Sequence, residues 1–287
     1  MKIGFIGQGW IGRNYADDFE NRGYEVIRYA LEEKYIQNKE KIAECDIVFI
    51  AVPTPTTEDG FDDSIVRIAL SHIGTGKIAV IKSTIVPGTT EKFQAEFPEI
   101  FVFHSPEFLV ELTAAYDAAN PNRNIIGIPL ENDEYTKRAK LVLSVLPKAP
   151  YETILKSSDA EFVKYAGNCF LLTKVIFMNM LFDLVNKMGG NWDHIKEALI
   201  HDPRVGTSHV EPTHKGGRGA GGHCFIKDFE AFRTLYDTLV QDETGSEILK
   251  NQANKNISLL VSSMKDIELL KGVYGEERIV KELEKQH

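Results

Sequence analysis

A glycine pattern placed directly after the first apolar run constrains this chain more than any other feature. Residues 3–6 are typical of a β-strand, and Gly7-Gln-Gly9-Trp-Ile-Gly12 follows at once and leads into a helical pattern. In such a turn one glycine permits the tight bend, one lets the backbone approach a pyrophosphate, and one lets the helix pack closely on the strand. N–H groups at the helix N-terminus would bind the phosphates. The pattern predicts a dinucleotide site, and the alternative is a tight turn without a ligand.

The order of elements predicts a doubly wound α/β fold of the Rossmann type. Helical patterns lie between most of the short apolar runs, as βαβ units require. Several of the runs are continuous, which suits strands buried on both faces of a parallel sheet. The predicted strands are 3–6, 25–29, 47–52, 78–81, 101–103 and 125–128. Pro147 and Pro150 mark the expected end of this domain, which we predict to comprise residues 1–150.

The second half is expected to be mainly helical, with a central domain over residues 151–264 and a short tail over 265–287. Ser158-Asp-Ala-Glu161 has the form of a capping box and opens a long apolar helix to about residue 188. Gly189-Gly190 would end that helix, and Asn191 would cap a second one through residue 200. A loop over 201–222, helices over 228–264 and a last helix over 276–285 follow.

Composition narrows the class of protein. The chain has 33 Lys and Arg against 42 Asp and Glu, a formal charge of −9, so it lacks the basic footprint of a nucleic-acid binder. No run of 18 uninterrupted apolar residues and no signal peptide is seen, so no membrane segment is expected. The three cysteines, Cys45, Cys169 and Cys224, are not a disulfide framework. These features are typical of a cytoplasmic enzyme.

Polar or proline-marked segments follow three of the predicted strands. In open parallel sheets, ligands bind beyond the carboxyl ends of the strands. We therefore expect these segments to border a ligand, although proline, serine and threonine also simply terminate strands. They are Val52-Pro-Thr54-Pro, Lys82-Ser-Thr84 and His104-Ser-Pro-Glu107-Phe-Leu-Val-Glu111.

The residue that would bind the ribose is less clear. Ala30 stands at the end of the second strand, where an Asp is expected. Glu32 or Glu33 would substitute for it, or Arg28 would favour a 2′-phosphate. NAD is the expected cofactor, and NADP is left open.

Two further segments carry chemistry-bearing side chains. Lys164 and Asn168 lie four residues apart on the long helix and share a face, as a site or as a surface pair; Glu161 would cap the helix or pair with Lys164. Five glycines lie between residues 216 and 222, and Cys224 follows them. Such glycines suit close approach of the backbone to a ligand. Cys224 would be a nucleophile activated by Lys227 or Lys164, or else a buried structural cysteine. The histidine and cysteine spacings match no zinc signature, so no metal is expected.

Taken together, these segments resemble the UDP-glucose/GDP-mannose dehydrogenase family. They occur in the family's order across roughly residues 3–260. The matching segments are the glycine pattern, Val52-Pro-Thr-Pro55, Lys82-Ser-Thr84 with Pro87-Gly88-Thr89, Ser105-Pro-Glu-Phe-Leu109 with Glu111, Lys164-Tyr-Ala-Gly-Asn168, Asp202-Pro-Arg204-Val-Gly206 and Gly221-Gly-His-Cys224-Phe-Ile-Lys-Asp228.

The resemblance implies oxidation of the primary alcohol of a nucleotide sugar to a carboxylate with two NAD⁺. Cys224 would form a thiohemiacetal and then a thioester, Lys164 and Asn168 would stabilise the oxyanion, and Glu111 would be the acid/base group. Asp228 and Thr84 would order water and Lys164. The family's cofactor contacts correspond to Gly7, Gly9, Trp10, Ile11, Gly12, Val52, Pro53, Thr54, Thr84, Glu111 and Lys227. Its substrate contacts correspond to Glu107, Phe108, Leu109, Lys164, Asn168, Lys215, Gly216, Gly217 and Gly221.

The resemblance also implies a homodimer through the helical domain, with the apolar helix face over 170–188 as its interface; packing between the two domains is the alternative. Family members carry a third α/β domain, which the roughly 25 residues after the helical domain cannot form. In the glycine-rich segment, Ala220 replaces the usual aromatic residue and Arg218 is unusual.

Two alternatives follow from these departures. In one, the chain is a compact enzyme that acts on a smaller or differently held substrate, with a dimer partner or a separate protein completing the site. In the other, it is a binding protein that kept the fold and lost turnover. The retained Lys164, Asn168, Cys224, Asp228 and Glu111 favour the enzyme. A one-step hydroxyacid dehydrogenase is a third alternative, but it would leave Cys224 idle.

Overall fold

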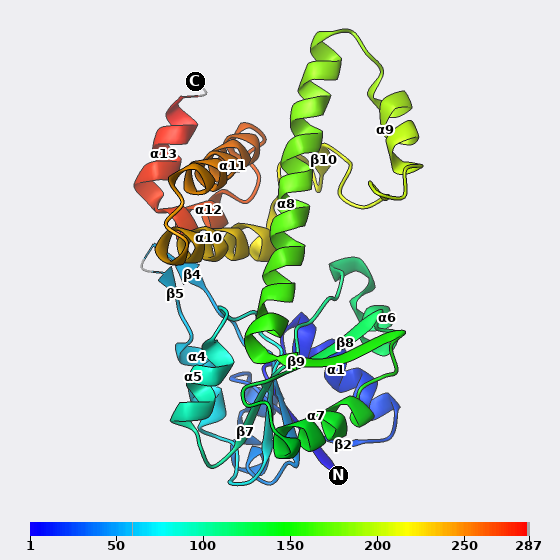
Figure 1. Cartoon of the computed structure of the whole chain (residues 1–287), viewed down its shortest axis with the longest axis vertical. Helices are drawn as coiled ribbons and strands as arrows, with labels where there is room; N and C mark the ends of the chain where they lie inside the picture. The colour runs from blue at the N-terminus through cyan, green and yellow to red at the C-terminus, as the bar shows by residue number, and fades with distance from the viewer. Residues whose placement is uncertain (59, 286–287) are drawn as a thin grey trace. The chain divides into compact units, whose positions relative to one another are not determined.

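The structure is a computed structural model that describes residues 1–58 and 60–285. The chain divides into two compact units (Figure 1). The first comprises Met1–Pro55 and Asp62–Lys164, and the second comprises Thr56–Phe61 and Tyr165–His287.

A seven-stranded sheet organises the first unit, and it confirms the predicted doubly wound α/β fold. Its order is β2-β1-β3-β6-β7-β8-β9, and its pairs are parallel except β7 with β8, which are antiparallel where His104 faces Gly127. The strands are β1 (Lys2–Ile6), β2 (Glu25–Tyr29), β3 (Ile47–Ile50), β6 (Ile78–Ile81), β7 (Phe101–His104), β8 (Arg123–Ile128) and β9 (Tyr151–Lys156).

Strand β9 was not predicted, and it corrects the boundary at residue 150. It pairs in parallel with the whole of β8 and lies at the edge of the sheet, so the two prolines before it do not end the domain. The first unit instead continues to Lys164.

The strands in the middle of the sheet are buried on both faces, as their continuous apolar sequences predict. Ile47 and Phe49 point into a core cluster that α1 (Trp10–Asn21), α6 (Ala114–Ala119) and α7 (Asp133–Val145) complete. Their neighbours Val48 and Ile50, which point to the opposite face, are also fully buried. The other helices of this unit are α2 (Glu33–Ile36), α3 (Lys39–Ile42), α4 (Ser64–Leu70), α5 (Thr89–Glu96) and a 3₁₀ turn at Glu111–Thr113.

The predicted long helix is α8 (Ser157–Lys187). Its end is confirmed: Gly189 has φ +71°, and the Gly190 N–H donates to the Val185 carbonyl at 2.8 Å. The predicted capping box is wrong. The Glu161 carboxylate accepts from the N–H of Gly88 at 2.6 Å and from the N–H and hydroxyl of Thr90 at 2.9 and 2.5 Å. It therefore caps α5 rather than its own helix.

Helix α8 also affects the question of a membrane segment. Among the described residues, α8 alone is long and apolar enough to cross a membrane, with a mean hydropathy of 1.5 over its most apolar window. In this structure 39% of that window is buried. The lack of 18 uninterrupted apolar residues therefore does not exclude a spanning helix. A single helix of this kind is weak support, because core helices of soluble proteins pass the same test.

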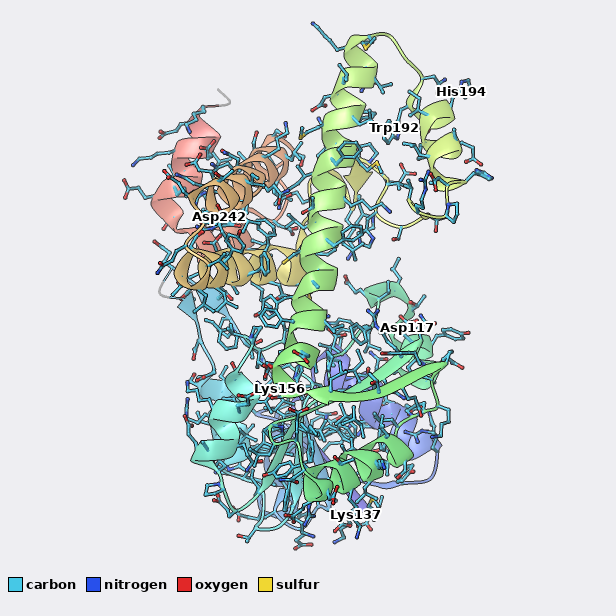
Figure 2. All side chains as sticks on the ribbon, in the orientation of Figure 1. Asp117, Lys137, Lys156, Trp192, His194 and Asp242 are labelled. Carbon is cyan, nitrogen blue, oxygen red and sulfur yellow. The ribbon has the colours of Figure 1, made fainter. Side chains whose placement is uncertain are left out.

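The second unit is mainly helical, as predicted. Asn191 caps α9 (Trp192–Ile200) by accepting from the His194 N–H at 3.1 Å. Trp192, labelled in Figure 2, is the first residue of this helix, and its ring packs edge-on against that of Phe182. Within the described residues, this unit also contains two short antiparallel strand pairs, the first of which precedes α8 in the chain, and four more helices. These are β4 (Thr56–Thr57) with β5 (Gly60–Phe61), β10 (Thr213–His214) with β11 (Gly217–Arg218), α10 (Gly222–Leu239), α11 (Glu243–Ser262), α12 (Ile267–Tyr274) and α13 (Glu276–Glu284).

The last segment is part of this unit's core. The helix predicted over 276–285 is confirmed as α13, and its Ile279 is fully buried with Ile226, Leu260 and Leu270. The segment predicted as a short tail ending in a helix therefore contains two helices, α12 and α13, that pack into this core.

Candidate functional site

The glycine turn has the geometry that its sequence predicts. Gly7 has φ +91°, and a Cβ there would lie 2.2 Å from the Ala51 carbonyl oxygen; a Cβ on Gly12 would lie 2.0 Å from the Gly7 carbonyl oxygen. Gly9 instead faces open space and precedes α1. The turn thus exposes backbone and the first N–H groups of α1, which fits a pyrophosphate. Trp10 is 39% exposed beside it, and Ile11 is half-buried.

At the end of β2, Arg28 was expected to be available to a 2′-phosphate, but it is already paired with two acids. The Arg28 guanidinium lies 2.6 Å from an Asp17 oxygen and 2.8 Å from a Glu20 oxygen, and these contacts raise its pKa despite its burial. Glu32 and Glu33 are exposed beyond Ala30.

The three polar strand ends meet, as the sequence predicts. The Ser83 hydroxyl accepts from the Val52 N–H at 3.0 Å and donates to the Val52 carbonyl at 2.7 Å, and the Thr54 hydroxyl donates to the Thr84 carbonyl at 2.8 Å. These bonds join the ends of β3 and β6. Pro53 is exposed beside them, whereas Thr54 and Thr84 are buried.

Lys82 links the ends of β6 and β7. Its ammonium donates to the Ser105 carbonyl and hydroxyl at 3.1 and 3.0 Å and lies 4.6 Å from the ring centre of Tyr15. The side chain is buried, and burial lowers the pKa of Lys82 to about 7; the charge of Glu107 opposes this shift and that of Lys164 adds to it. Lys82 has no predicted role beyond its place in the Lys82-Ser-Thr84 motif. The sequence does contain a signal that Lys82 is buried, because this lysine directly follows a fully apolar strand.

Lys164 pairs with Glu107. The Lys164 ammonium donates to a Glu107 carboxylate oxygen at 2.7 Å and to the Glu107 carbonyl at 2.9 Å, and both side chains are buried. The other Glu107 oxygen accepts from the Leu109 N–H at 3.0 Å. This ion pair joins residues 57 positions apart, so spacing along the helix could not reveal it. Helix α8 is thereby tied to the segment after β7.

The other predicted residues of that segment are half-buried or exposed, and Leu109 packs against the core cluster of the first unit. Phe108 is half-buried under the Arg123 guanidinium, 3.7 Å from the ring centre. Glu111 lies on the 3₁₀ turn and is exposed.

In the second unit, Asp228 orients two of the predicted residues. The Asn168 amide donates to one Asp228 oxygen at 2.6 Å, and the Lys227 ammonium donates to the other at 2.5 Å. The Asp228 side chain is only 1% exposed. Cys169, next to Asn168, is buried, and burial raises the pKa of its thiol to about 12. Its thiol is therefore kept protonated.

Cys224 lies on a helix and not in a loop. Helix α10 begins at Gly222, whereas helical structure was predicted only from residue 228. Cys224 is half-buried in the first turn, four residues before Asp228. The two residues therefore share a face of α10, which brings Cys224 toward the side of the helix that orients Asn168.

The glycines before Cys224 have a partly different reason from the one predicted. A Cβ on Gly217 would lie 2.8 Å from side-chain atoms of Ser263 and Lys265, and one on Gly221 would lie 2.1 Å from an Asp266 oxygen. Backbone here approaches the protein's own α11–α12 link. Lys215 and Gly216 form the exposed turn of the β10–β11 hairpin, with φ +50° and +78°.

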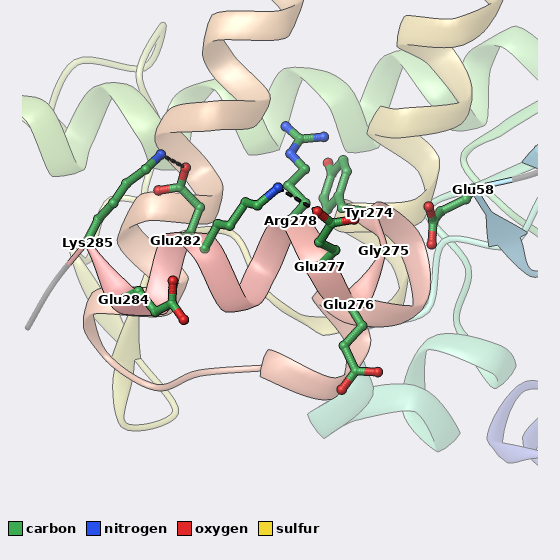
Figure 3. Close-up of a pocket in the computed structure, with 10 residues that line it drawn as sticks. Glu58, Tyr274, Gly275, Glu276, Glu277, Arg278, Glu282, Glu284 and Lys285 are labelled. Atoms are coloured by element: carbon green, nitrogen blue, oxygen red, sulfur yellow. Dashed lines mark hydrogen bonds and ion pairs between the residues drawn. The ribbon is translucent and has the colours of Figure 1, made fainter.

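A surface pocket of about 970 Å³ lies elsewhere in the second unit, between Glu58 and α13 (Figure 3). Five glutamates and three basic residues line it, and two of the bases are paired, Lys281 with Glu277 and Lys285 with Glu282. None of the residues that line it belongs to the predicted site. Among the described residues, no group of three or more His, Cys, Asp or Glu side chains is placed to hold a metal ion; the His223 side chain lies outside them.

Two family models match the chain, one in its N-terminal half and one in its C-terminal half. The NAD binding domain of the UDP-glucose/GDP-mannose dehydrogenase family matches residues 32–142, and its central domain matches residues 158–258. Together the matches cover about three quarters of the chain.

Individual relatives agree with the family models. The chain is 32% identical over 233 residues to the UDP-glucose 6-dehydrogenase YwqF of Bacillus subtilis, covering 76% of this chain and 51% of that protein. It is 27% identical over 295 residues to UDP-glucose 6-dehydrogenase of Streptococcus pneumoniae, covering 89% of this chain and 74% of that protein. A solved UDP-glucose dehydrogenase from Pyrobaculum islandicum superposes with a TM-score of 0.76 at 26% identity, covering 97% of this chain and 71% of that one. The chain thus spans about half the length of the Bacillus relative.

Proposed function

Because the chain belongs to the UDP-glucose/GDP-mannose dehydrogenase family, we propose that it oxidises the primary alcohol of a nucleotide sugar to a carboxylate. The overall change is alcohol plus two NAD⁺ plus water to carboxylate plus two NADH plus three protons. Bound NAD supplies the hydride acceptor for each oxidation. The single observation that carries the proposal is the placement of Cys224 in the first turn of α10, on the same face as the Asp228 that orients Asn168.

The glycine turn of the first unit would hold the dinucleotide. Gly9 and the first N–H groups of α1 offer the pyrophosphate open backbone, with Gly7, Trp10, Ile11 and Gly12 forming the rest of the turn. The strand-end residues Val52, Pro53, Thr54 and Thr84, together with Glu111 and Lys227, complete the proposed contacts of the cofactor.

Cys224 would hold the substrate between the two oxidations. Its thiolate adds to the aldehyde carbon and gives a thiohemiacetal, which can lose a second hydride and become a thioester. The position of Cys224 at a helix N-terminus suits a thiolate, because the positive end of the helix dipole stabilises negative charge. Water then attacks the thioester, and the thiolate leaves.

Lys164 and Asn168 would stabilise the negative oxygen that forms in these steps. Glu107 holds the Lys164 ammonium at 2.7 Å, and Asp228 holds the Asn168 amide at 2.6 Å. Each donor is thus fixed before the reaction, which is the condition under which such groups lower a barrier most. Glu111 would serve as acid and base toward the substrate or water, with Thr84 and Asp228 ordering that water. The sugar nucleotide would contact Glu107–Leu109, Lys215–Gly217 and Gly221.

We further propose a homodimer through α8. Its exposed apolar side chains recur every seven residues at Phe170, Phe177 and Leu184, which are 67%, 57% and 57% exposed. A stripe of this kind seeks a partner helix. We also propose that the protein is soluble and cytoplasmic.

The test is the yield of NADH from purified protein with UDP-glucose, UDP-N-acetyl sugars and GDP-mannose. We expect two NADH per sugar with one of these, and no carboxylate from Cys224→Ala. Cys45→Ala is the matched thiol control; Cys45 is buried in the first unit and its loss should leave the yield unchanged. NAD binding without NADH formation from any of the sugars would refute catalysis by this chain and favour a binding protein. One NADH per sugar that persists in Cys224→Ala would indicate a one-step dehydrogenase.

A further inference from the structure

Two acids of α1 enclose the one basic side chain of β2. The Arg28 Nη2 lies 2.6 Å from Asp17 Oδ1 and 2.8 Å from Glu20 Oε2, and its Nε donates to Glu20 Oε1 at 3.0 Å. The Arg28 side chain is 11% exposed, whereas those of Asp17 and Glu20 are about half exposed. The arginine therefore lies under its two acids, which face the solvent.

This cluster is close to the dinucleotide turn. The Arg28 Nη1 donates to the Gln8 side-chain oxygen at 3.4 Å, and Gln8 is the buried residue between Gly7 and Gly9. Arg28 also precedes by two residues Ala30, which occupies the position where an acid normally binds the ribose. Residues two apart along an extended chain point to the same side. The cluster thus lies where the 2′-substituent of an adenosine ribose is recognised in this fold.

We infer that Asp17 and Glu20 determine the preference for NAD over NADP in this chain, by occupying Arg28. The inference rests on the proposed binding of a dinucleotide. One guanidinium faces two carboxylates, so the cluster carries a net charge of −1. A 2′-phosphate adds roughly two negative charges and can recruit Arg28 only by breaking both ion pairs. The uncharged 2′-hydroxyl of NAD meets neither obstacle. The two acids thereby take the role of the single acidic residue that normally stands at the position of Ala30.

The simpler role of this cluster is to fasten α1 to β2. Ion pairs whose acids are half exposed contribute little to stability, so neutralising the acids should leave the fold intact. A fastening role predicts no change in the choice between the two dinucleotides, and the two roles are therefore separable by binding measurements that need no turnover.

The experiment measures the Kd of NAD and of NADP by calorimetry on the whole chain. The main variant is Asp17→Asn with Glu20→Gln, and Glu20→Gln alone guards against misfolding of the double variant. Arg28→Ala in the double background tests whether the freed arginine is the new phosphate ligand. Asp133→Asn with Glu134→Gln is the matched control, because these exposed acids of α7 change the net charge of the same unit equally.

We expect the wild type to bind NAD more tightly, and the double variant to shift the Kd ratio toward NADP by roughly tenfold or more. The added Arg28→Ala change should remove that gain, the control pair should leave the ratio unchanged, and high salt should shrink the shift. An unchanged ratio in a double variant that still binds NAD would overturn the inference and leave the proposed function intact. Binding of neither dinucleotide by the folded wild type would overturn both.

Discussion

The buried ammonium of Lys82 predicts a variant that is more stable than the wild type, by an amount that depends on pH. The pKa of Lys82 is about 7 in the folded chain and 10.5 for an ordinary lysine. Between these values the unfolded chain binds more protons, so the stability of the wild type rises with pH. The full cost of burying the charge is present below pH 7. Lys82→Met keeps an unbranched chain of similar size and removes that cost.

The size of the effect follows from the pKa difference. At 1.36 kcal/mol per pKa unit, burying the charge costs about 5 kcal/mol at acid pH, and about 3 kcal/mol of this is lost between pH 6 and pH 9. Against it stands the loss of the two hydrogen bonds to Ser105, about 1–2 kcal/mol. Lys82→Met should therefore be more stable by about 3 kcal/mol at pH 6 and nearly equal to the wild type at pH 9.

Urea unfolding at the two pH values measures this difference. Trp10 lies in the first unit and Trp192 in the second, so a Trp192→Phe background makes the fluorescence report the unit that contains Lys82. Lys137→Met is the control, since Lys137 is an exposed lysine of α7 in the same unit (Figure 2). A stability gain of equal size at pH 6 and pH 9, or a loss at both, would refute the argument that Lys82 is a buried, partly deprotonated amine.

Two further variants test packing and charge elsewhere. Gly221→Ala places a Cβ 2.1 Å from an Asp266 oxygen and should destabilise the second unit by about 1–3 kcal/mol. In Gly167→Ala the added Cβ has no neighbour within 4 Å, so this change should stabilise helix α8 by up to about 1 kcal/mol. The fluorescence of Trp192 during urea unfolding checks both changes. Burial raises the pKa of Glu161 from 4.5 to about 7, so the folded chain binds the extra proton between these values and loses stability as the pH rises. The stability of the wild type relative to Glu161→Gln should fall by about 2–3 kcal/mol from pH 5 to pH 8, and a difference that does not change with pH would contradict the raised pKa.

The first unit was largely predictable because the strands in the middle of its sheet are buried on both faces. Residues 47–50 and 78–81 are uninterrupted apolar runs, which in a chain of this composition leave little choice but a covered parallel sheet. Strand β9 was missed because its sequence, Tyr-Glu-Thr-Ile-Leu-Lys, is neither a continuous apolar run nor a regular alternation, and because it follows two prolines. Its pairing with β8 is a tertiary contact that local sequence does not display.

The start of α10 escaped for a related reason. Glycine has low helix propensity, so Gly221-Gly222 indicates a loop, although the helix begins there. What fixes the segment is the approach of Gly217 and Gly221 to residues of the α11–α12 link more than 40 positions later. The residue types of the candidate site were predictable from motifs, but the partners were not. Glu161 fits a capping box by spacing, yet its donors are 71 and 73 positions away.

The charged groups of the first unit fall into two kinds, and the distinction bears on function. Lys82, Glu107, Glu161 and Lys164 are all buried, and burying charge costs more than paired charges usually return. Glu161 is accounted for as the cap of α5, whereas the clustering of Lys82, Glu107 and Lys164 around the strand ends and the start of α8 favours a chemical role for these three. Asp17 and Glu20, by contrast, remain half in solvent and cost little to keep. Neutralising Lys82 should therefore raise stability at acid pH, whereas neutralising the two acids of α1 should change the choice of dinucleotide and leave stability nearly unchanged. Measured on the same set of variants, the two quantities separate groups that are kept for chemistry from groups that discriminate between ligands.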